Sequence, residues 1–202
     1  YVFLLAIAIL SSLSLIAQNS DNIPPKHEFR ATWCATVTNI DWPTASNLTV
    51  AQQKAELIAI LDKLQAGNIN AVCLQVRSQG DALYKSSYEP WAVALTGTRG
   101  KDPGYDPLEY AIQEAHNRGM ELHAWVNPFR MSTTEGGRLT EAQVISLYNG
   151  LSWDWVLTYD NGTFTGQIID PGYPAAREYI KNVVMEIVDK YDIDGILMDD
   201  YF

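Results

Sequence analysis

The sequence has 202 residues, of which 47% are hydrophobic and 19% are charged, so its composition is that of an ordinary folded protein. Its net charge of -10, without any cluster of Lys and Arg, argues against a nucleic-acid-binding surface. Aromatic residues make up 11% of the chain, and their flat faces suit core packing first and stacking on sugar rings second.

The first 17 residues are apolar and uncharged, a pattern typical of the hydrophobic region of a secretory signal peptide. They include no initiator Met and no basic start, so we expect a signal peptide clipped at its start and cleaved after Ala17, followed by a linker over residues 18–27. A membrane anchor is the second interpretation, but the apolar run is short and interrupted by serines. We therefore expect an exported protein of the periplasm, the cell envelope or the extracellular space, which meets the membrane only through this signal segment.

Only two cysteines occur, Cys34 and Cys73, and both fall inside predicted neighbouring strands. An exported protein could pair them, yet buried thiols are the favoured interpretation at such positions. The three histidines, His27, His116 and His123, are scattered without metal-ligand spacing. The sequence therefore predicts no metal site and no cofactor.

From Pro24 onward, strand and helix patterns alternate, which is the signature of a parallel sheet. Strands are predicted over residues 28–37, 69–77, 120–127 and 196–198, and helices over residues 50–66, 106–118 and 174–190. Two long excursions interrupt the alternation. The first is a loop over residues 78–105; the second, residues 128–173, contains a short helix over 141–148 and a hairpin at Asp160-Asn161-Gly162.

The predicted fold class is α/β, with a TIM-type (β/α)8 barrel of which this chain holds the N-terminal half, about four β/α units. A barrel of this type usually needs about 250 residues, and four strands cannot close it. An open parallel half would also expose a long strand edge, which natural folds avoid. We therefore expect residues 28–202 to be the N-terminal part of a catalytic barrel that is truncated at its C-terminus.

The polar side chains of the predicted strands share one face. Side chains alternate along a strand, and in a barrel the apolar face packs outward against helices while the polar face points inward. This rule predicts that five side chains converge at the carboxyl ends of the strands: Gln75, Arg77, His123, Asn127 and Asp199. The alternative is a bulge or a register error, which would turn the side chains of any one strand to the other face.

Several motifs, in this order, resemble the glycosyl hydrolase-like 10 family of exported bacterial proteins over roughly residues 28–202. They are Glu28-x-Arg30-x-x-Trp33, Gln75-Val-Arg77 with Asp81, Gly104-Tyr-Asp-Pro-Leu108, His123-Ala-Trp-Val-Asn-Pro-Phe-Arg130, Asp170-Pro-Gly172 with Arg177, and Asp194-Gly195 leading to Asp199-Asp-Tyr-Phe202. That family is similar to the α-amylase-like barrel glycosidases, in which an Asp at the end of the fourth strand is the nucleophile. The resemblance therefore implies a glycoside hydrolase.

In the related pattern the nucleophile follows the first residue of an Asp-Gly pair by five positions, and counting from Asp194 selects Asp199 as the catalytic residue. Arg77 beside it would keep its carboxylate ionised. Strand alternation aims Asp200 away from Asp199, so the general acid is expected beyond Phe202 and the fragment is expected to be inactive by itself. Both aspartates also have a plainer interpretation, because Asp is common in turns and caps.

We predict the carbohydrate-binding residues from the inward face of the strands and from the resemblance to the family. They are Arg30, Gln75, Arg77, Asp81, His123, Trp125, Asn127, Arg130, Asp170, Asp200 and Tyr201. Arginines would hold hydroxyl or carboxylate groups, His and Asn would hydrogen-bond ring hydroxyls, and Trp would stack on a sugar face. Each has a structural alternative, since the arginines could pair with nearby acidic residues and the tryptophans could fill the core.

The sequence thus predicts hydrolysis of O-glycosyl bonds in a polysaccharide or cell-wall glycan, with peptidoglycan strands as the first substrate to test. A non-catalytic carbohydrate-binding barrel protein of the cell envelope is the alternative, because Leu197 stands where the family often has His. A metal-dependent deacylase is disfavoured by the lack of a His/Asp ligand cluster in the sequence.

Overall fold

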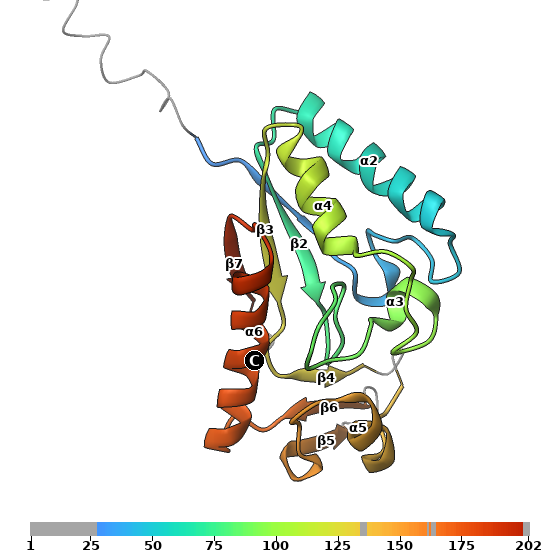
Figure 1. The fold of residues 1–202 in the computed structure, drawn as a ribbon, viewed down its shortest axis with the longest axis vertical. Helices are drawn as coiled ribbons and strands as arrows, with labels where there is room; N and C mark the ends of the chain where they lie inside the picture. Colours follow the sequence, from blue (N-terminus) through green and yellow to red (C-terminus); the bar gives the residue numbers. More distant parts are fainter. Residues whose placement is uncertain (1–27, 134–136, 161, 163–164, 200–202) are drawn as a thin grey trace, which may run out of the picture.

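The computed structural model describes residues 28–133, 137–160, 162 and 165–199, and its centre is a four-stranded parallel sheet (Figure 1). The strands are β1 (Ala31–Cys34), β2 (Ala71–Arg77), β3 (Glu121–Val126) and β7 (Gly195–Met198), in the spatial order β1-β2-β3-β7. Because every neighbouring pair is parallel, the four carboxyl ends lie at one edge of the sheet. The predicted α/β architecture with a parallel sheet is confirmed.

Helices α2 (Val50–Ala66) and α4 (Pro107–His116) cover one face of this sheet (Figure 1). Local sequence determines where they begin: α2 follows Thr49, which forms a capping box with Gln52, and α4 follows the N-cap Asp106. Between these helices and the sheet lies the main hydrophobic core, whose buried members include Leu57, Leu61, Val72, Leu74, Leu108, Ala111, Leu122 and Ala124.

Between β3 and β7 the chain leaves the parallel sheet and builds a second, antiparallel sheet, toward which the arrowheads of β2 and β3 point in Figure 1. Its strands are β4 (Arg130–Ser132), β5 (Val156–Asp160) and β6 (Thr165–Ile169), in the order β4-β6-β5, accompanied by α5 (Glu141–Leu147) and the 3₁₀ turn η3 (Trp153–Trp155). Strands β5 and β6 pair antiparallel along their whole length, as the predicted hairpin requires, and Asn161 of its predicted turn lies outside the described residues. Helix α6 (Pro174–Lys190) then returns the chain to β7.

The excursion after β2, residues 78–105, is irregular apart from isolated bridges and the short helix α3 (Val93–Thr96). Glu186 of α6 holds this loop, because its carboxylate accepts from the Ser86 hydroxyl at 2.6 Å and from the Ser87 N–H at 2.7 Å. Burial alone would raise the pKa of Glu186, but these bonds and the Lys190 ammonium lower it. The predicted loop is therefore ordered by polar contacts rather than by secondary structure.

Both cysteines are free and buried, as predicted. Burial, with a smaller contribution from Asp41, raises the pKa of the Cys34 thiol to about 12, so Cys34 is an unreactive thiol inside the sheet. Among the residues that the structure describes, none of the helices is both long and apolar enough to cross a membrane.

The entry into β7 is fixed by Asp194, which immediately precedes the strand. Its Oδ2 accepts from the Leu122 N–H at 2.7 Å and lies 2.8 Å from Nε2 of His116. Burial raises the pKa of Asp194, but the bonds from His116 and Leu122 outweigh burial and hold this pKa below its usual value. The ionised carboxylate therefore ties β7 to both α4 and β3.

Because the folded-state pKa of Asp194 is depressed, its contribution to stability is present above the unfolded-state pKa of about 3.9 and is lost as the pH falls through the lower folded-state value. We expect Asp194→Asn to unfold at a lower temperature than the parent at neutral pH, and the difference to shrink below about pH 4. Thermal unfolding of the full-length protein as a function of pH measures both. Asp192→Asn is the matched control, since that carboxylate lies 3.9 Å from the same His116 but is 96% exposed; an equal effect in both variants would contradict the assignment.

Candidate active site

A row of hydrogen-bonded side chains crosses the carboxyl ends of three strands. Gln75 of β2 donates from Nε2 to Oδ1 of Asn127 at 2.6 Å, and Asn127, which follows β3, donates from Nδ2 to Oδ1 of Asp199 at 2.5 Å. Asp199 directly follows β7. Three of the five side chains that were predicted to converge therefore meet, and the site is centred on Asp199.

The donor and the acceptor of every hydrogen bond in this row are determined by the backbone groups that bind Gln75, at the end opposite Asp199. The N–H groups of Thr36 and Val37 both donate to Oε1 of Gln75, each at 2.9 Å, so the other end of the Gln75 amide must be the donor. Asn127 must then accept with its oxygen and present its NH₂ group to Asp199. A carboxylate that receives a fixed donor is held in one orientation.

Thr36 is the member of this row that sequence reasoning missed. Its hydroxyl donates to the Gln75 carbonyl at 2.8 Å, and both residues are fully buried. The available signal was its position, because Thr36 follows β1 at the same edge of the sheet where Gln75, Asn127 and Asp199 lie. Buried polar groups at that edge must be hydrogen-bonded to one another, so a Thr there belongs to the same network.

The predicted position of Arg77 beside Asp199 is wrong. The ladder between β2 and β3 shifts register between Gln75 and Arg77, so that Gln75 pairs with Trp125 but Arg77 pairs with Val126. This bulge turns Arg77 to the face that carries Val126, away from the inward face. The guanidinium is completely buried there and forms two hydrogen bonds to Glu89, at 2.7 Å and 2.6 Å. Arg77 is therefore a structural residue and not a ligand of the substrate or of Asp199.

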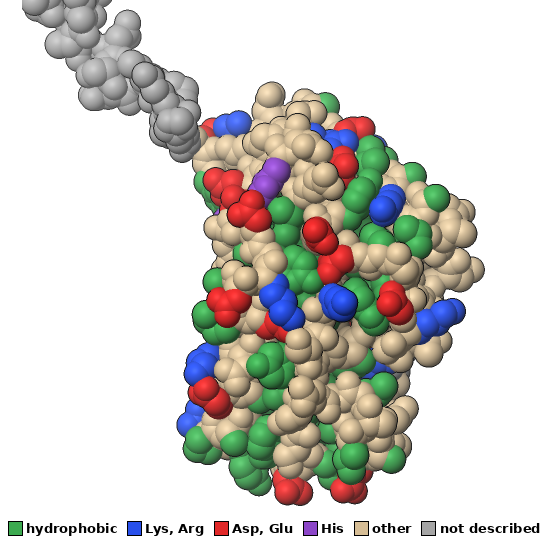
Figure 2. All heavy atoms as spheres, in the orientation of Figure 1, with side chains coloured by type: hydrophobic (Ala, Val, Ile, Leu, Met, Phe, Trp, Pro, Cys, Tyr) green, Lys and Arg blue, Asp and Glu red, His purple; other side chains and the backbone are tan. Residues whose placement is uncertain are grey.

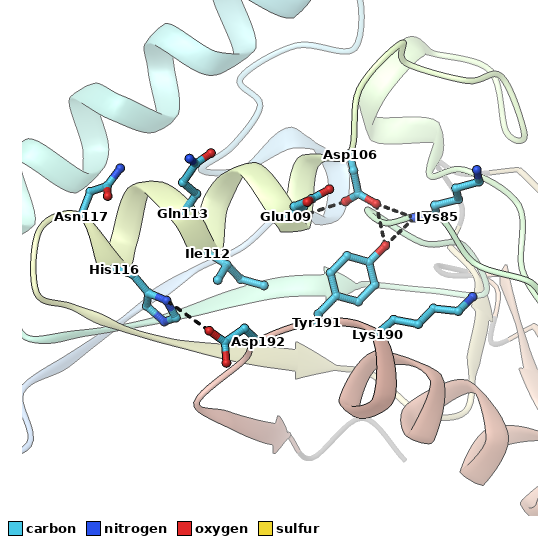
Figure 3. A pocket seen from close by; sticks show the side chains of 10 residues that line it. All are labelled: Lys85, Asp106, Glu109, Ile112, Gln113, His116, Asn117, Lys190, Tyr191 and Asp192. Atoms are coloured by element: carbon cyan, nitrogen blue, oxygen red, sulfur yellow. Dashed lines mark hydrogen bonds and ion pairs between the residues drawn. The ribbon is translucent and has the colours of Figure 1, made fainter.

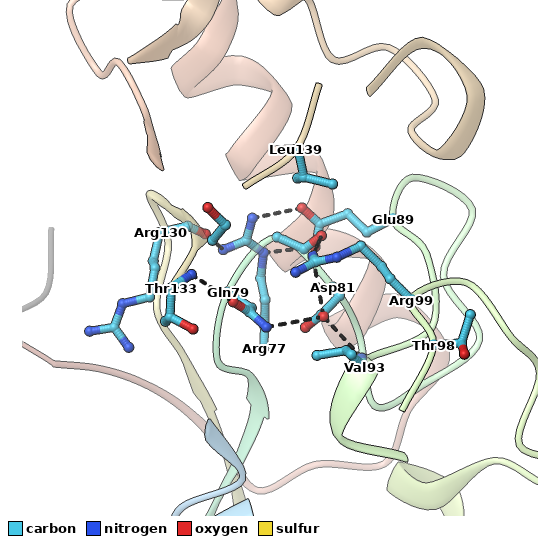
Figure 4. Close-up of polar contacts among 12 residues, drawn as sticks. Arg77, Gln79, Asp81, Glu89, Val93, Thr98, Arg99, Arg130, Thr133 and Leu139 are labelled. Carbon is cyan, nitrogen blue, oxygen red and sulfur yellow. Dashed lines mark hydrogen bonds and ion pairs between the residues drawn. The ribbon is translucent and has the colours of Figure 1, made fainter. Parts of the chain in front are cut away.

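Asp81 belongs to the same buried charge network, which Figure 4 shows, and it too is inaccessible to a substrate. Its Oδ2 lies 3.2 Å from Nη1 of Arg99 and accepts from the Val93 N–H at 3.1 Å. Burial lowers the pKa of Arg77 on its own, but Glu89 opposes burial and raises this pKa, so the arginine stays charged. The network fixes the loop after β2 against the end of that strand. Glu89 and Arg99 lie in that irregular loop, where no periodic pattern marked them.

His123 and Trp125 lie on the same face of β3 as Asn127, as predicted. They lie further from the carboxyl end of the strand than Asn127 does. His123 precedes Asn127 by four residues, roughly 13 Å along a strand, and its Nε2 lies 2.8 Å from a Glu121 oxygen. Trp125 lies between them and meets the Trp33 ring edge-on, with ring centroids 4.6 Å apart. The strand exit is therefore reached by Asn127 alone, and the expected convergence of His123 is wrong.

Three further nominated residues lie in separate places. Arg30 lies at the opposite, amino end of the sheet, where it bonds the Asn68 carbonyl and the exposed Glu28, so the structure does not bring it to the strand exits. Asp170 follows β6 and accepts from the Gly172 N–H in a tight turn ahead of α6. Arg130 begins β4 at the exits of β2 and β3, where its Nη1 lies 3.4 Å from the Ser78 carbonyl.

Asp200 and Tyr201, the remaining nominated residues, lie outside the described part of the chain. Within residues 28–133, 137–160, 162 and 165–199, no group of three or more His, Cys, Asp and Glu side chains is arranged to hold a metal ion.

A cavity of about 840 Å³ lies away from these strand exits, between α4 and the link from α6 to β7 (Figure 3). There the Tyr191 hydroxyl donates to Asp106 at 2.6 Å and accepts from the Lys85 N–H at 3.1 Å. Its lining mixes basic with acidic side chains, and charges of both signs are interspersed over the face shown in Figure 2. The cavity is on the helix side of the sheet and does not include Asp199.

Solved structures share this arrangement of strands and helices. The maltogenic α-amylase AmyB of Thermotoga neapolitana superposes with a TM-score of 0.51 at 16% identity, over 86% of this chain and 39% of that one. A cycloisomaltooligosaccharide glucanotransferase of Paenibacillus sp. gives 0.50 at 14% identity, over 85% of this chain and 23% of that one. The class is therefore an α/β protein with the fold of barrel glycosidases.

The chain belongs to the Glycosyl hydrolase-like 10 family, which it matches over residues 28–202. It is 44% identical over 183 residues to the glycosyl hydrolase YngK of Bacillus subtilis, and 38% identical over 187 residues to the glycosyl hydrolase DigH of Escherichia coli K12. These alignments cover 90% and 86% of this chain, but 34% and 42% of those two proteins. The chain thus spans less than half the length of either relative, and the resemblance seen in the motifs is confirmed.

Proposed function

We propose that this chain carries the nucleophile side of a glycosidase active site, in the N-terminal half of a TIM-type barrel, with Asp199 as the nucleophile. The observation that carries the proposal is the directed row from Gln75 through Asn127 to Asp199, which ends on a carboxylate at the carboxyl edge of a parallel sheet. Such edges are where parallel α/β folds place their chemistry. Membership of a glycosyl hydrolase-like family supports the same assignment.

Asp199 would act by attacking the anomeric carbon while a second carboxyl group protonates the leaving oxygen. Retaining enzymes hold the two carboxyl groups about 5–5.5 Å apart, and inverting enzymes hold them further apart to admit a water. The Asn127 NH₂ group holds the Asp199 carboxylate in one orientation, which is what a nucleophile needs. We place the general acid on a later strand, beyond Phe202, so we expect residues 28–202 to show no turnover by themselves.

We further propose that the substrate is a polysaccharide or a cell-wall glycan and that the protein is exported. The apolar, uncharged residues 1–17 support export as a signal peptide. Arg130 lies at the strand exits beside Asp199, where its guanidinium can donate to sugar hydroxyls. Peptidoglycan strands freed of peptide are the glycan that we would test first.

The test is the release of reducing ends from a panel of glycans by the full-length protein and by its Asp199→Asn variant. We expect hydrolysis by the parent and a loss of at least about 10³-fold in the variant, with glycan binding retained, because the variant is isosteric but cannot form the glycosyl intermediate. Asp192→Asn, a change at an exposed carboxylate, serves as the control and should leave the rate unaltered.

Two outcomes would count against the proposal. Full activity in Asp199→Asn would remove Asp199 from the chemistry. Binding of glycans without turnover by the parent would support the alternative, a carbohydrate-binding barrel protein of the cell envelope, in which Leu197 occupies a position that the family often gives to His.

A further inference from the structure

We propose that a second cavity, of about 410 Å³ at the carboxyl edge of the sheet, is a binding subsite for an uncharged sugar unit, an inference that rests on the proposed function. It is bounded by Thr38 and Asn39 after β1, by Ser78 and Gln79 after β2, and by Thr133 after β4. The same segments flank the row that ends on Asp199. Its volume lies within the roughly 300–1,000 Å³ of known ligand pockets.

The lining has the chemistry of a sugar site. It includes four residues that carry hydroxyls, Thr38, Ser46, Ser78 and Thr133, and two that carry amides, Asn39 and Gln79. The hydroxyls of Thr38, Ser46 and Ser78 form no hydrogen bond with another described residue. Hydroxyls both donate and accept, so they match ring hydroxyls in either orientation. Val93 and Ala94 add a small apolar wall.

The two amides are already oriented before any ligand arrives. Asn39 uses its NH₂ group on the carbonyls of Pro43, at 2.7 Å, and Ala94, at 3.0 Å, so its Oδ1 remains as an acceptor. Gln79 accepts from the Thr133 N–H at 3.1 Å, as Figure 4 shows, and its NH₂ group faces Asp81 at 3.4 Å. Preorganised acceptors reduce the entropy lost on binding.

The backbone at the mouth of the cavity is strained. Thr38 and Asn39 have φ angles of 51° and 57°, in the left-handed region that a β-branched residue such as Thr rarely adopts. Strain of this kind persists only where the surroundings impose it, and it concentrates at ligand sites. Here Thr38 lines the cavity at a position where Gly would adopt the backbone conformation more easily.

The charge of the site selects the kind of sugar. None of the described residues that line the cavity is charged. Two charged side chains contact its wall from outside the lining: Arg130 Nη1 lies 3.4 Å from the Ser78 carbonyl, and the buried carboxylate of Asp81 accepts from the Val93 N–H. Because no lining residue offers a cation to an acidic sugar, the subsite favours a neutral hexose or N-acetylhexosamine over a uronic acid or a lactyl-bearing sugar.

The experiment measures binding in the full-length Asp199→Asn variant, so that hydrolysis does not consume the probe. An oligosaccharide of N-acetylglucosamine is the neutral probe, and an oligogalacturonate of the same length is the acidic one. We expect the neutral probe to bind more tightly. Adding Thr38→Gly should weaken its binding about fivefold while thermal stability stays equal or rises, because one hydrogen bond is lost and strain is relieved.

Ala94→Leu, which fills the cavity, should weaken binding at least about tenfold, and Ala142→Leu on the exposed face of α5 is its matched control. Unchanged binding in both Thr38→Gly and Ala94→Leu would overturn the inference, as would equal affinity for the acidic probe or no binding of the neutral one. If the parent protein hydrolyses glycans but these variants bind as before, the inference fails and the proposed function stands. If the variants lose binding but no glycan is hydrolysed, the subsite stands and the proposed nucleophile fails.

Discussion

Replacing Arg77 by Met is expected to destabilise the full-length protein by about 3–5 kcal/mol. The change removes the only cation that forms hydrogen bonds to Glu89 among the described residues, and both side chains are completely buried. A carboxylate left alone in such a place must either lose its charge or carry an uncompensated desolvation cost. Urea unfolding of parent and variant measures the difference.

The pH dependence of this loss distinguishes the ion pair from simple packing. In Arg77→Met the pKa of Glu89 should rise, since burial already raises it and the opposing guanidinium is gone. A raised folded-state pKa of an acid makes stability fall with increasing pH, so the variant should be weaker at about pH 8 than at about pH 5. Loss of packing alone would give the same deficit at both values.

Two further variants complete the test. Arg77→Met combined with Glu89→Leu should recover much of the stability, because an apolar pair can replace a buried ion pair at little cost. Arg30→Ala breaks the exposed pair with Glu28 and should change stability by about 0–1 kcal/mol. Similar losses for Arg30→Ala and Arg77→Met would contradict the structural role that we assign to Arg77.

Helix positions in this chain were predictable because their signals are local. The predicted helices over residues 50–66 and 174–190 coincide with α2 and α6, and the capping box at Thr49 and Pro174 at the first turn account for their starts. The strands were predicted in the right places, but the first three were predicted too long and the last, over residues 196–198, one residue too short, since side-chain pattern does not show where ladder pairing begins and ends. The parallel pairing was predicted from the alternation of strand and helix.

The site was only partly predictable because its geometry depends on pairing between strands. Alternation placed Gln75, Asn127 and Asp199 on one face correctly. It failed at Arg77, since the bulge after Gln75 appears only when β2 is laid against β3. Alternation also predicts which face of the sheet a side chain lies on, but not how far along the strand it lies. His123 was therefore expected at the carboxyl end, although it pairs with Gly195 at the start of β7.

The second large effect is expected at Asn127, which acts on the reaction through Asp199 and is therefore a positioning residue. Asn127→Asp keeps the shape of the side chain but replaces the NH₂ donor, now 2.5 Å from Asp199, by a second carboxylate oxygen. Two carboxylates at such a distance cannot both ionise easily. The pair therefore keeps one shared proton up to a higher pH than a single carboxylate would. In the variant that shared proton would leave the nucleophile protonated for part of the time.

We expect kcat of Asn127→Asp to fall about 10²-fold in the full-length protein at neutral pH, with KM changed little, because orientation and charge of Asp199 are lost while the binding surface remains. The acidic limb of the profile of kcat against pH should move to higher pH. Asn149→Asp is the matched control: this exposed residue donates to the Ser87 carbonyl, far along the chain from the row, and should leave both limbs in place.

The direction of the hydrogen bonds in the row predicts that Gln75→Glu will shift the pH profile of kcat as Asn127→Asp does. A purely structural role of Gln75 would not produce this shift. Gln75→Glu keeps an oxygen for the N–H groups of Thr36 and Val37 but sets its other oxygen against Oδ1 of Asn127. The Asn127 amide is then expected to flip and turn its oxygen toward Asp199, so Gln75→Glu should shift the acidic limb in the same direction as Asn127→Asp, although it touches neither Asp199 nor a sugar. A fall in kcat without that shift would mean that Gln75 supports only the fold.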